Sequence, residues 1–193
     1  MTAVPHPSTM TARQRDRRER LLDAGLAALA GIDYDQIQVK DVADQAGVSL
    51  GTLYNYFVSK ERFFAEVLVR WADSLPTHVK RRPPAQDSPV GRLTDTVHRA
   101  LHAFERHPQM ARMVNILMMS TDPFAVELIQ RIDRSSSDVY MQSLAGIDPA
   151  RSRRIVNVVQ AVFGSELREW SLGRSSMSEV YQEIDATIQL LLG

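Results

Sequence analysis

The chain has 193 residues, of which 44% are hydrophobic and 7% aromatic, with 23 basic and 23 acidic side chains and no cysteine. That length suits one ordinary domain, or a small module joined to a larger one, with a mainly aliphatic core. The lack of cysteine excludes disulfides, thiolate metal sites and a cysteine nucleophile. The first ten residues lack the apolar run of a secretory signal, and no stretch reaches the roughly 20 apolar residues of a membrane helix, so we expect a cytoplasmic protein.

The apolar spacing is helical throughout, which predicts an all-α fold of about nine helices. The first three helices are expected at Thr11–Ala30, Val39–Ala46 and Leu50–Tyr56, and a fourth begins near Ser59. Gly31 and Gly47 are expected to end the first two, as glycine commonly does past a helix end. Pro76 is expected to end or kink the fourth helix, because proline lacks a backbone donor and clashes with the preceding turn.

The proline-rich segment Arg81–Pro89 is the clearest loop, and we place the internal boundary near it. This boundary divides the chain into a smaller N-terminal head, residues 11–70, and a larger body, residues 71–193. Prolines begin several of the later helices, where the first helical position tolerates them. These helices are expected at Val90–Arg106, Gln109–Ser120, Pro123–Ala145, Pro149–Leu172 and Ser178–Leu192.

Residues 38–57 have the pattern of a helix-turn-helix. Small Ala43 lets a second helix cross closely, and Gly47 supplies the left-handed conformation that a sharp turn needs. Ser49 is a natural N-cap for the second helix of the motif. Leu53 and Phe57, four residues apart, are expected to face the core.

The remaining residues of this second helix are expected to face outward, and their side chains suit contacts with double-stranded DNA. Glycine at position 51 destabilises a helix by about 1 kcal/mol relative to alanine. Its missing side chain would suit a position that DNA approaches closely. Tyrosine hydroxyls suit phosphates, and Asn55 can pair with adenine through two hydrogen bonds. The predicted DNA-binding residues are Gln38, Lys40, Ser49, Gly51, Thr52, Tyr54, Asn55, Tyr56 and Lys60.

The zero net charge counts mildly against DNA binding, because basic domains are the usual electrostatic footprint. Arginines nevertheless gather near the start of the first helix, at Arg13, Arg15, Arg17, Arg18 and Arg20. Two interpretations stay open for this cluster: a solvated first helical turn, or an arm that contacts phosphates.

The run from Val42 to Glu61 resembles the signature of TetR-type transcriptional repressors, and the likeness extends over residues 12–68. The resemblance implies an all-helical homodimer in which a small molecule in each body changes the spacing of two DNA-reading heads. It places Lys40, Thr52, Tyr54, Tyr56 and Lys60 at DNA-contacting positions. Many members have Thr or Ser where this chain has Gln38, which is a poorer helix cap.

The body is rich in methionine and aromatic residues, which suit an adaptable apolar pocket. The candidate pocket residues are Phe104, Met110, Met113, Leu117, Met118, Phe124, Phe163 and Trp170. Segments 103–108 and 154–159, together with Gln38, also resemble the cholesterol-catabolism repressors of the same family. This second resemblance implies a largely apolar effector, such as a sterol-derived molecule or a fatty acyl thioester.

The helix predicted at Pro149–Leu172 is apolar on more than one face, so it needs burial on two sides. We expect it to form a four-helix interface with the last helix and the same pair of a second subunit. Two heads about 34 Å apart would then read a palindrome. The interface candidates are Val158, Val162, Leu167, Ile184, Ile188 and Leu191.

No catalytic or cofactor motif is recognised in the sequence. His98 and His102 have metal-ligand spacing but lack the Glu of a metalloprotease motif, so no metal site is predicted. There is no phosphate-binding glycine loop and no Gly-x-Ser-x-Gly elbow, so no cofactor and no enzymatic activity are predicted. The rival functions are an all-helical small-molecule-binding protein or enzyme without a DNA function, and a non-catalytic interaction module.

Overall fold

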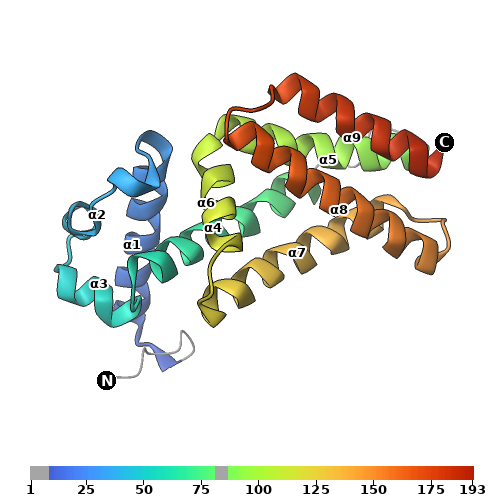
Figure 1. Cartoon of the computed structure of the whole chain (residues 1–193). Coiled ribbons are helices and arrows are strands. Elements are labelled where there is room, and N and C mark those ends of the chain that lie inside the picture. Colours follow the sequence, from blue (N-terminus) through green and yellow to red (C-terminus); the bar gives the residue numbers. More distant parts are fainter. Residues whose placement is uncertain (1–8, 81–86) are drawn as a thin grey trace.

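The computed structural model describes residues 9–80 and 87–193, and this part of the chain is all-α (Figure 1). Most of the predicted loop Arg81–Pro89, and most of the segment examined for a secretory signal, lie outside the described residues. The elements in order are α1 (Ala12–Gly31), η2 (Tyr34–Gln36), α2 (Val39–Gln45), α3 (Leu50–Tyr56), α4 (Lys60–Lys80), α5 (Pro89–Arg106), α6 (Pro108–Met118), α7 (Pro123–Ser143), α8 (Pro149–Ser171) and α9 (Met177–Leu192).

Side-chain caps fix where most of these helices begin, since they satisfy backbone donors that have no partner within the helix. Thr11 and Gln14 form a reciprocal capping box at α1. Gln38 makes no side-chain bond at the start of α2, as expected for a poor cap. The other capping side chains belong to Ser49, Ser59, Ser88, Asp122, Asp148 and Ser176.

Helix α1 ends at Gly31, within one residue of the predicted end, although Gly31 has no positive φ and the next residue, Ile32, is extended. Helix α4 continues past Pro76 to Lys80, so this proline does not end it. A proline costs one hydrogen bond here, and α4 is long enough to be held by its packing against α1, α6 and α7. Gly47, by contrast, has the predicted left-handed conformation, with φ of 69°.

Helices α1, α2 and α3 form a head at one end of the molecule, and α4 runs from this head into the body (Figure 1). Helices α1 and α4 cross closely at Gly25, where an added Cβ would lie 2.6 Å from Cζ of Phe63. The core of the head is continuous through α4 with the part of the body formed by α6 and α7. The predicted boundary between residues 70 and 71 therefore falls inside α4, a helix that the head and body share.

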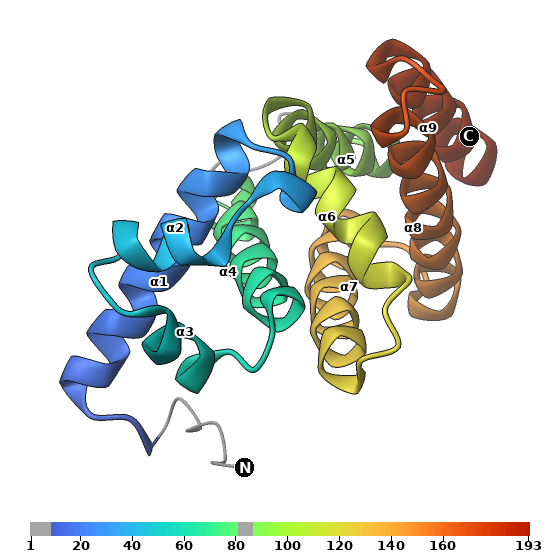
Figure 2. The same cartoon turned by 60° about the vertical axis from the view of Figure 1, so that its left-hand side comes forward.

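The body consists of α5 to α9, with a second hydrophobic core between α5, α7, α8 and α9. Helices α8 and α9 pack side by side at the side of the body remote from α2 and α3 (Figures 1 and 2). No helix in the described part of the chain is both long and apolar enough to cross a membrane.

Candidate nucleic-acid interface and ligand cavity

Helices α2 and α3 form the predicted helix-turn-helix, and its turn has the expected chemistry. After α2, the Val48 amide donates to the Ala43 carbonyl over 3.0 Å, which closes the turn around the left-handed Gly47. The hydroxyl oxygen of Ser49 then accepts from the Thr52 amide at 3.1 Å and caps α3. Ala43 and Leu53 are fully buried where the two helices meet.

The outward surface of this motif presents most of the predicted DNA-binding residues. Tyr54 is 42% exposed, and the space around Gly51 is open, since an added Cβ would meet only the Ser49 hydroxyl at 4.0 Å. Nothing inside the protein therefore requires glycine at this position. The other exposed or half-exposed members are Gln38, Lys40, Ser49, Thr52 and Asn55.

Tyr56 does not face outward as predicted. It is only 6% exposed and its ring packs beside Phe57, with centroids 6.3 Å apart. The prediction used the four-residue spacing from Leu53 to Phe57 and overlooked the three-residue spacing from Leu53 to Tyr56. Residues three and four apart share a helix face, so both aromatic rings turn inward.

Lys60 is not a free charge on the surface. Its ammonium donates to the Ile37 carbonyl over 2.8 Å and lies 4.5 Å from the centre of the Tyr34 ring. Burial lowers the pKa of Lys60, against a smaller opposing effect of Asp35. Lys60 thus holds the segment before α2 against α4, a structural role that the sequence did not indicate.

Part of the N-terminal arginine cluster also serves the fold. Arg18 pairs with Glu66 and stacks on the Phe57 ring, 5.4 Å from its centre, and desolvation lowers the pKa of its guanidinium. Arg20 donates to the Ala46 carbonyl over 2.8 Å at the end of α2. Arg13 is exposed, so a phosphate-contacting role stays a prediction for that end of the cluster.

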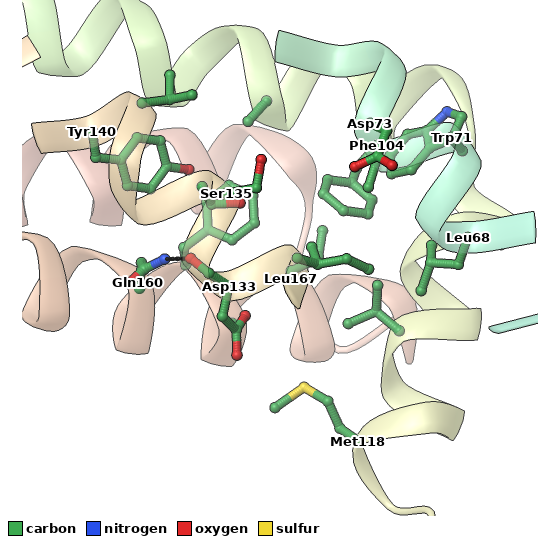
Figure 3. Close-up of a pocket in the computed structure, with 18 of the residues that line it drawn as sticks. Leu68, Trp71, Asp73, Phe104, Met118, Asp133, Ser135, Tyr140, Gln160 and Leu167 are labelled. Atoms are coloured by element: carbon green, nitrogen blue, oxygen red, sulfur yellow. Dashed lines mark hydrogen bonds between the residues drawn. The ribbon is translucent and has the colours of Figure 1, made fainter. Parts of the chain in front are cut away.

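A cavity of about 360 Å³ opens in the body between α4, α5, α6, α7 and α8. Among the predicted pocket residues, Phe104, Met118 and Phe163 line it. Its apolar end contains Leu68, Trp71 and Phe104, whereas Ser135, Tyr140 and Gln160 lie at the opposite end (Figure 3). No lysine, arginine or histidine of the described residues lines this cavity.

Five predicted pocket residues lie elsewhere. Met110, Met113 and Leu117 are at most 1% exposed and fill the core between α6 and its neighbours. Phe124 lies under the guanidinium of Arg62, 5.3 Å from the ring centre, and Trp170 packs between the two cores without lining the cavity. Helical spacing places a residue on the inner face, but it does not distinguish a filled core from a cavity wall.

Three predicted interface residues are also wrong. Leu167, Ile184 and Ile188 are at most 3% exposed within their own subunit, so a partner cannot reach them. Leu167 instead forms part of the cavity wall, and the two isoleucines fill the core beneath α9. The inner face of an amphipathic helix was mistaken for the outer one. Val158 is 42% exposed on α8, and Val162 and Leu191 are half-buried.

The paired histidines of α5 contact different carboxylates. Nε2 of His98 lies 2.7 Å from Oδ1 of Asp185, and Nδ1 of His102 lies 3.3 Å from Oε2 of Glu105. Each imidazole ring therefore has its own carboxylate partner, and the two rings do not converge on a shared metal position.

Two family descriptions match this chain: bacterial regulatory proteins of the tetR family over residues 21–67, and the tetracyclin repressor-like C-terminal domain over residues 87–191. The HTH-type transcriptional repressor KstR of Mycobacterium tuberculosis is 29% identical over 181 residues, covering 93% of this chain and 82% of the relative.

Solved structures share the fold. A TetR transcriptional regulator from Rhodococcus sp. RHA1 superposes with a TM-score of 0.79 at 23% identity, covering 93% of this chain and 97% of the other. The regulator FadR from Bacillus subtilis, in complex with stearoyl-CoA, has a TM-score of 0.69 at 16% identity, covering 91% and 97%. The resemblance read from residues 42–61 is thus confirmed: this chain belongs to the TetR family of transcriptional regulators.

Proposed function

We propose that this protein is a repressor that binds a palindromic operator as a homodimer and is released by a largely apolar effector held in the body cavity. The observation that carries the proposal is the placement of α4. Its first turn follows α3, the proposed recognition helix, and its later residues Leu68 and Trp71 form a wall of the cavity. A ligand that shifts α4 therefore acts on both sites, which is how binding at one site changes affinity at another.

The DNA contacts are proposed on the exposed residues of the helix-turn-helix. Tyr54 and Lys40 would contact phosphates, while Asn55 and Thr52 would meet base edges. Gly51 leaves room for the DNA itself. Gln38 and Ser49 complete the proposed surface, whereas Tyr56 and Lys60 act mainly by holding the motif together.

The effector is proposed to be a sterol-derived molecule or a fatty acyl thioester. The cavity volume lies within the range of about 300–1,000 Å³ typical of small-molecule sites, and one end is apolar. The stearoyl-CoA complex of FadR supports this class, because FadR shares the fold of this chain and holds an acyl thioester.

The homodimer is proposed to form through the outer faces of α8 and α9. Leu190 is 87% exposed and Leu172 is 54% exposed, and both join Val158 as apolar side chains without cover in a single subunit. Val162 and Leu191 would border this surface. The proposal further includes a head of residues 11–70, a body of residues 71–193, action in the cytoplasm and no catalytic turnover.

Selection of bound DNA from a random pool tests this function directly. We expect a palindromic consensus with half-sites about 34 Å apart, bound more weakly as salt increases, because phosphate contacts release counterions. An added apolar ligand should release the protein from that DNA. Selection of no consensus, or turnover of the ligand, would overturn the proposal.

A further inference from the structure

A buried tyrosine on α7 has a hydroxyl that no part of the described protein uses. Tyr140 is 5% exposed, yet its hydroxyl has no hydrogen-bond partner among the described residues and is not sealed in the packed core. It lines the body cavity, and Figure 3 shows the hydroxyl pointing from α7 into that cavity. Buried polar groups normally have a partner, because leaving one unpaired costs free energy.

Two neighbouring polar side chains of the lining, Thr96 and Gln160, already have hydrogen-bond partners, whereas Ser135 and Ser136 are less buried than Tyr140. Thr96 donates to the Arg92 carbonyl and shares a hydrogen bond with the Ser143 hydroxyl, both at 2.8 Å. The Gln160 amide donates to the Asp133 carbonyl over 3.1 Å (Figure 3). Its oxygen accepts from the Ser137 hydroxyl at 2.9 Å. These bonds fix the polar end of the cavity as a rigid frame around the free phenol.

The charge of the lining restricts what can occupy the cavity. Two aspartates line it, Asp73 beside Phe104 and Trp71 and Asp133 nearer Gln160, and no basic side chain of the described residues does (Figure 3). Asp73 is paired with Arg131, whereas Asp133 is exposed at the rim. A carboxylate or phosphate inside the cavity would lose its water without gaining a counter-charge, which is costly. A neutral oxygen meets no such penalty.

We infer that Tyr140 is a specificity-determining residue that donates a hydrogen bond to a neutral oxygen, a ketone or hydroxyl, carried by an otherwise apolar effector. This rests on the proposed function, because it names the chemistry of the same effector site. Burial raises the pKa of the Tyr140 hydroxyl, so the phenol keeps its proton and remains a donor at physiological pH. Any anionic portion of the effector lies outside the cavity.

The test measures binding of three ligands with the same eleven carbons: 2-undecanone, 2-undecanol and undecanoate. Calorimetry should show the wild-type protein binding the ketone and alcohol at least tenfold more tightly than the carboxylate. Tyr140→Phe should weaken the binding of the ketone about tenfold, which corresponds to about 1.4 kcal/mol of binding free energy. The Tyr140→Phe apoprotein should melt near the wild-type temperature, since the hydroxyl has no partner to lose.

Tyr181→Phe is the matched control, because this half-buried tyrosine on α9 bonds to Glu105 and does not line the cavity. Its ligand affinities should equal those of wild type. Equal ketone binding by wild type and Tyr140→Phe, or tighter binding of undecanoate, would overturn this inference alone. If the wild-type protein binds none of the three ligands, both this inference and the proposed effector site are wrong.

Discussion

The guanidinium of Arg62 and the carboxylate of Asp122 form a two-bonded ion pair between the head and the body. Nε of Arg62 lies 2.7 Å from Oδ2 of Asp122, and Nη2 lies 3.0 Å from Oδ1. Asp122 also caps α7 by accepting from the Phe124 amide at 2.9 Å. Since Arg62 lies in the first turn of α4 and α7 lines the cavity, this pair is a direct polar link between the two proposed sites.

Breaking this pair should weaken the link without removing the helix cap. Asp122→Asn keeps a capping oxygen but loses the charge, and Arg62→Gln removes the partner. A double-mutant cycle with urea unfolding should give a coupling energy of roughly 1 kcal/mol, modest because both groups are partly exposed. In DNA titrations, each single variant should show a smaller ligand-induced change in affinity than wild type. An unchanged ligand effect in both variants would show that the pair does not couple the sites.

The ion pair of Arg62 and Asp122 predicts that the stability of the fold depends on pH. The hydrogen bond from Arg62 holds the pKa of Asp122 below its ordinary value. A carboxylate with a lowered folded-state pKa stabilises the fold above its unfolded pKa of about 4, and this stabilisation is lost as pH falls through the folded value. The stability difference between wild type and Asp122→Asn should therefore be present at pH 7 and shrink toward pH 3. A difference that grows on acidification would contradict the assignment.

Gly51→Ala separates folding from DNA binding. Alanine is favoured over glycine inside a helix by about 1 kcal/mol, and the added Cβ meets nothing closer than the Ser49 hydroxyl at 4.0 Å. We expect a higher melting temperature together with weaker DNA binding, because the methyl group occupies space that DNA would need. A stabilised variant with unchanged DNA affinity would show that Gly51 does not lie against DNA.

The sequence predicted the helices and the turn better than it predicted which partner each side chain contacts. Gly47 and Ser49 have local roles, a left-handed turn and a cap, that depend on neighbouring residues only. The contacts of Lys60 with Ile37 and Tyr34 were not predicted, because these two partners come from a different segment of the chain. The distinction between cavity wall, core and outer face depends in the same way on tertiary packing, which periodicity does not encode.

Tyr54 and Asn55 should affect DNA binding in different ways. Tyr54→Phe removes only the hydroxyl proposed to contact phosphate, so affinity should fall for all sequences alike, with an unchanged salt dependence because a neutral hydroxyl releases no counterions. Asn55→Ala should relax preference at one base pair, at a cost of about 1–3 kcal/mol on the preferred sequence. Binding to a panel of single-base operator variants measures both effects. Sequence-independent loss for Asn55→Ala would show that it does not read a base.

Gly25→Ala should destabilise the head. The new Cβ would lie 2.6 Å from Cζ of Phe63 and 2.8 Å from Cγ2 of Val67, where α1 crosses α4. Overpacking of this kind typically costs 1–3 kcal/mol, roughly the range expected in urea unfolding. Gly31→Ala is the matched control in the same helix, because nothing lies within 4 Å of its added Cβ. Equal stability of the two variants would mean that α1 and α4 do not cross as closely as described.

Val158→Asp should convert the proposed dimer into a monomer. Val158 is 42% exposed on α8, so a single subunit tolerates the carboxylate, whereas a dimer through this face would bury an unpaired charge. Val126→Asp is the control: this valine of α7 is 41% exposed but lies outside the α8 and α9 surface. In sedimentation at micromolar concentration, wild type and Val126→Asp should be dimers and Val158→Asp a monomer. Monomeric wild-type protein would refute the dimer itself, whereas a dimeric Val158→Asp would place its interface on another face.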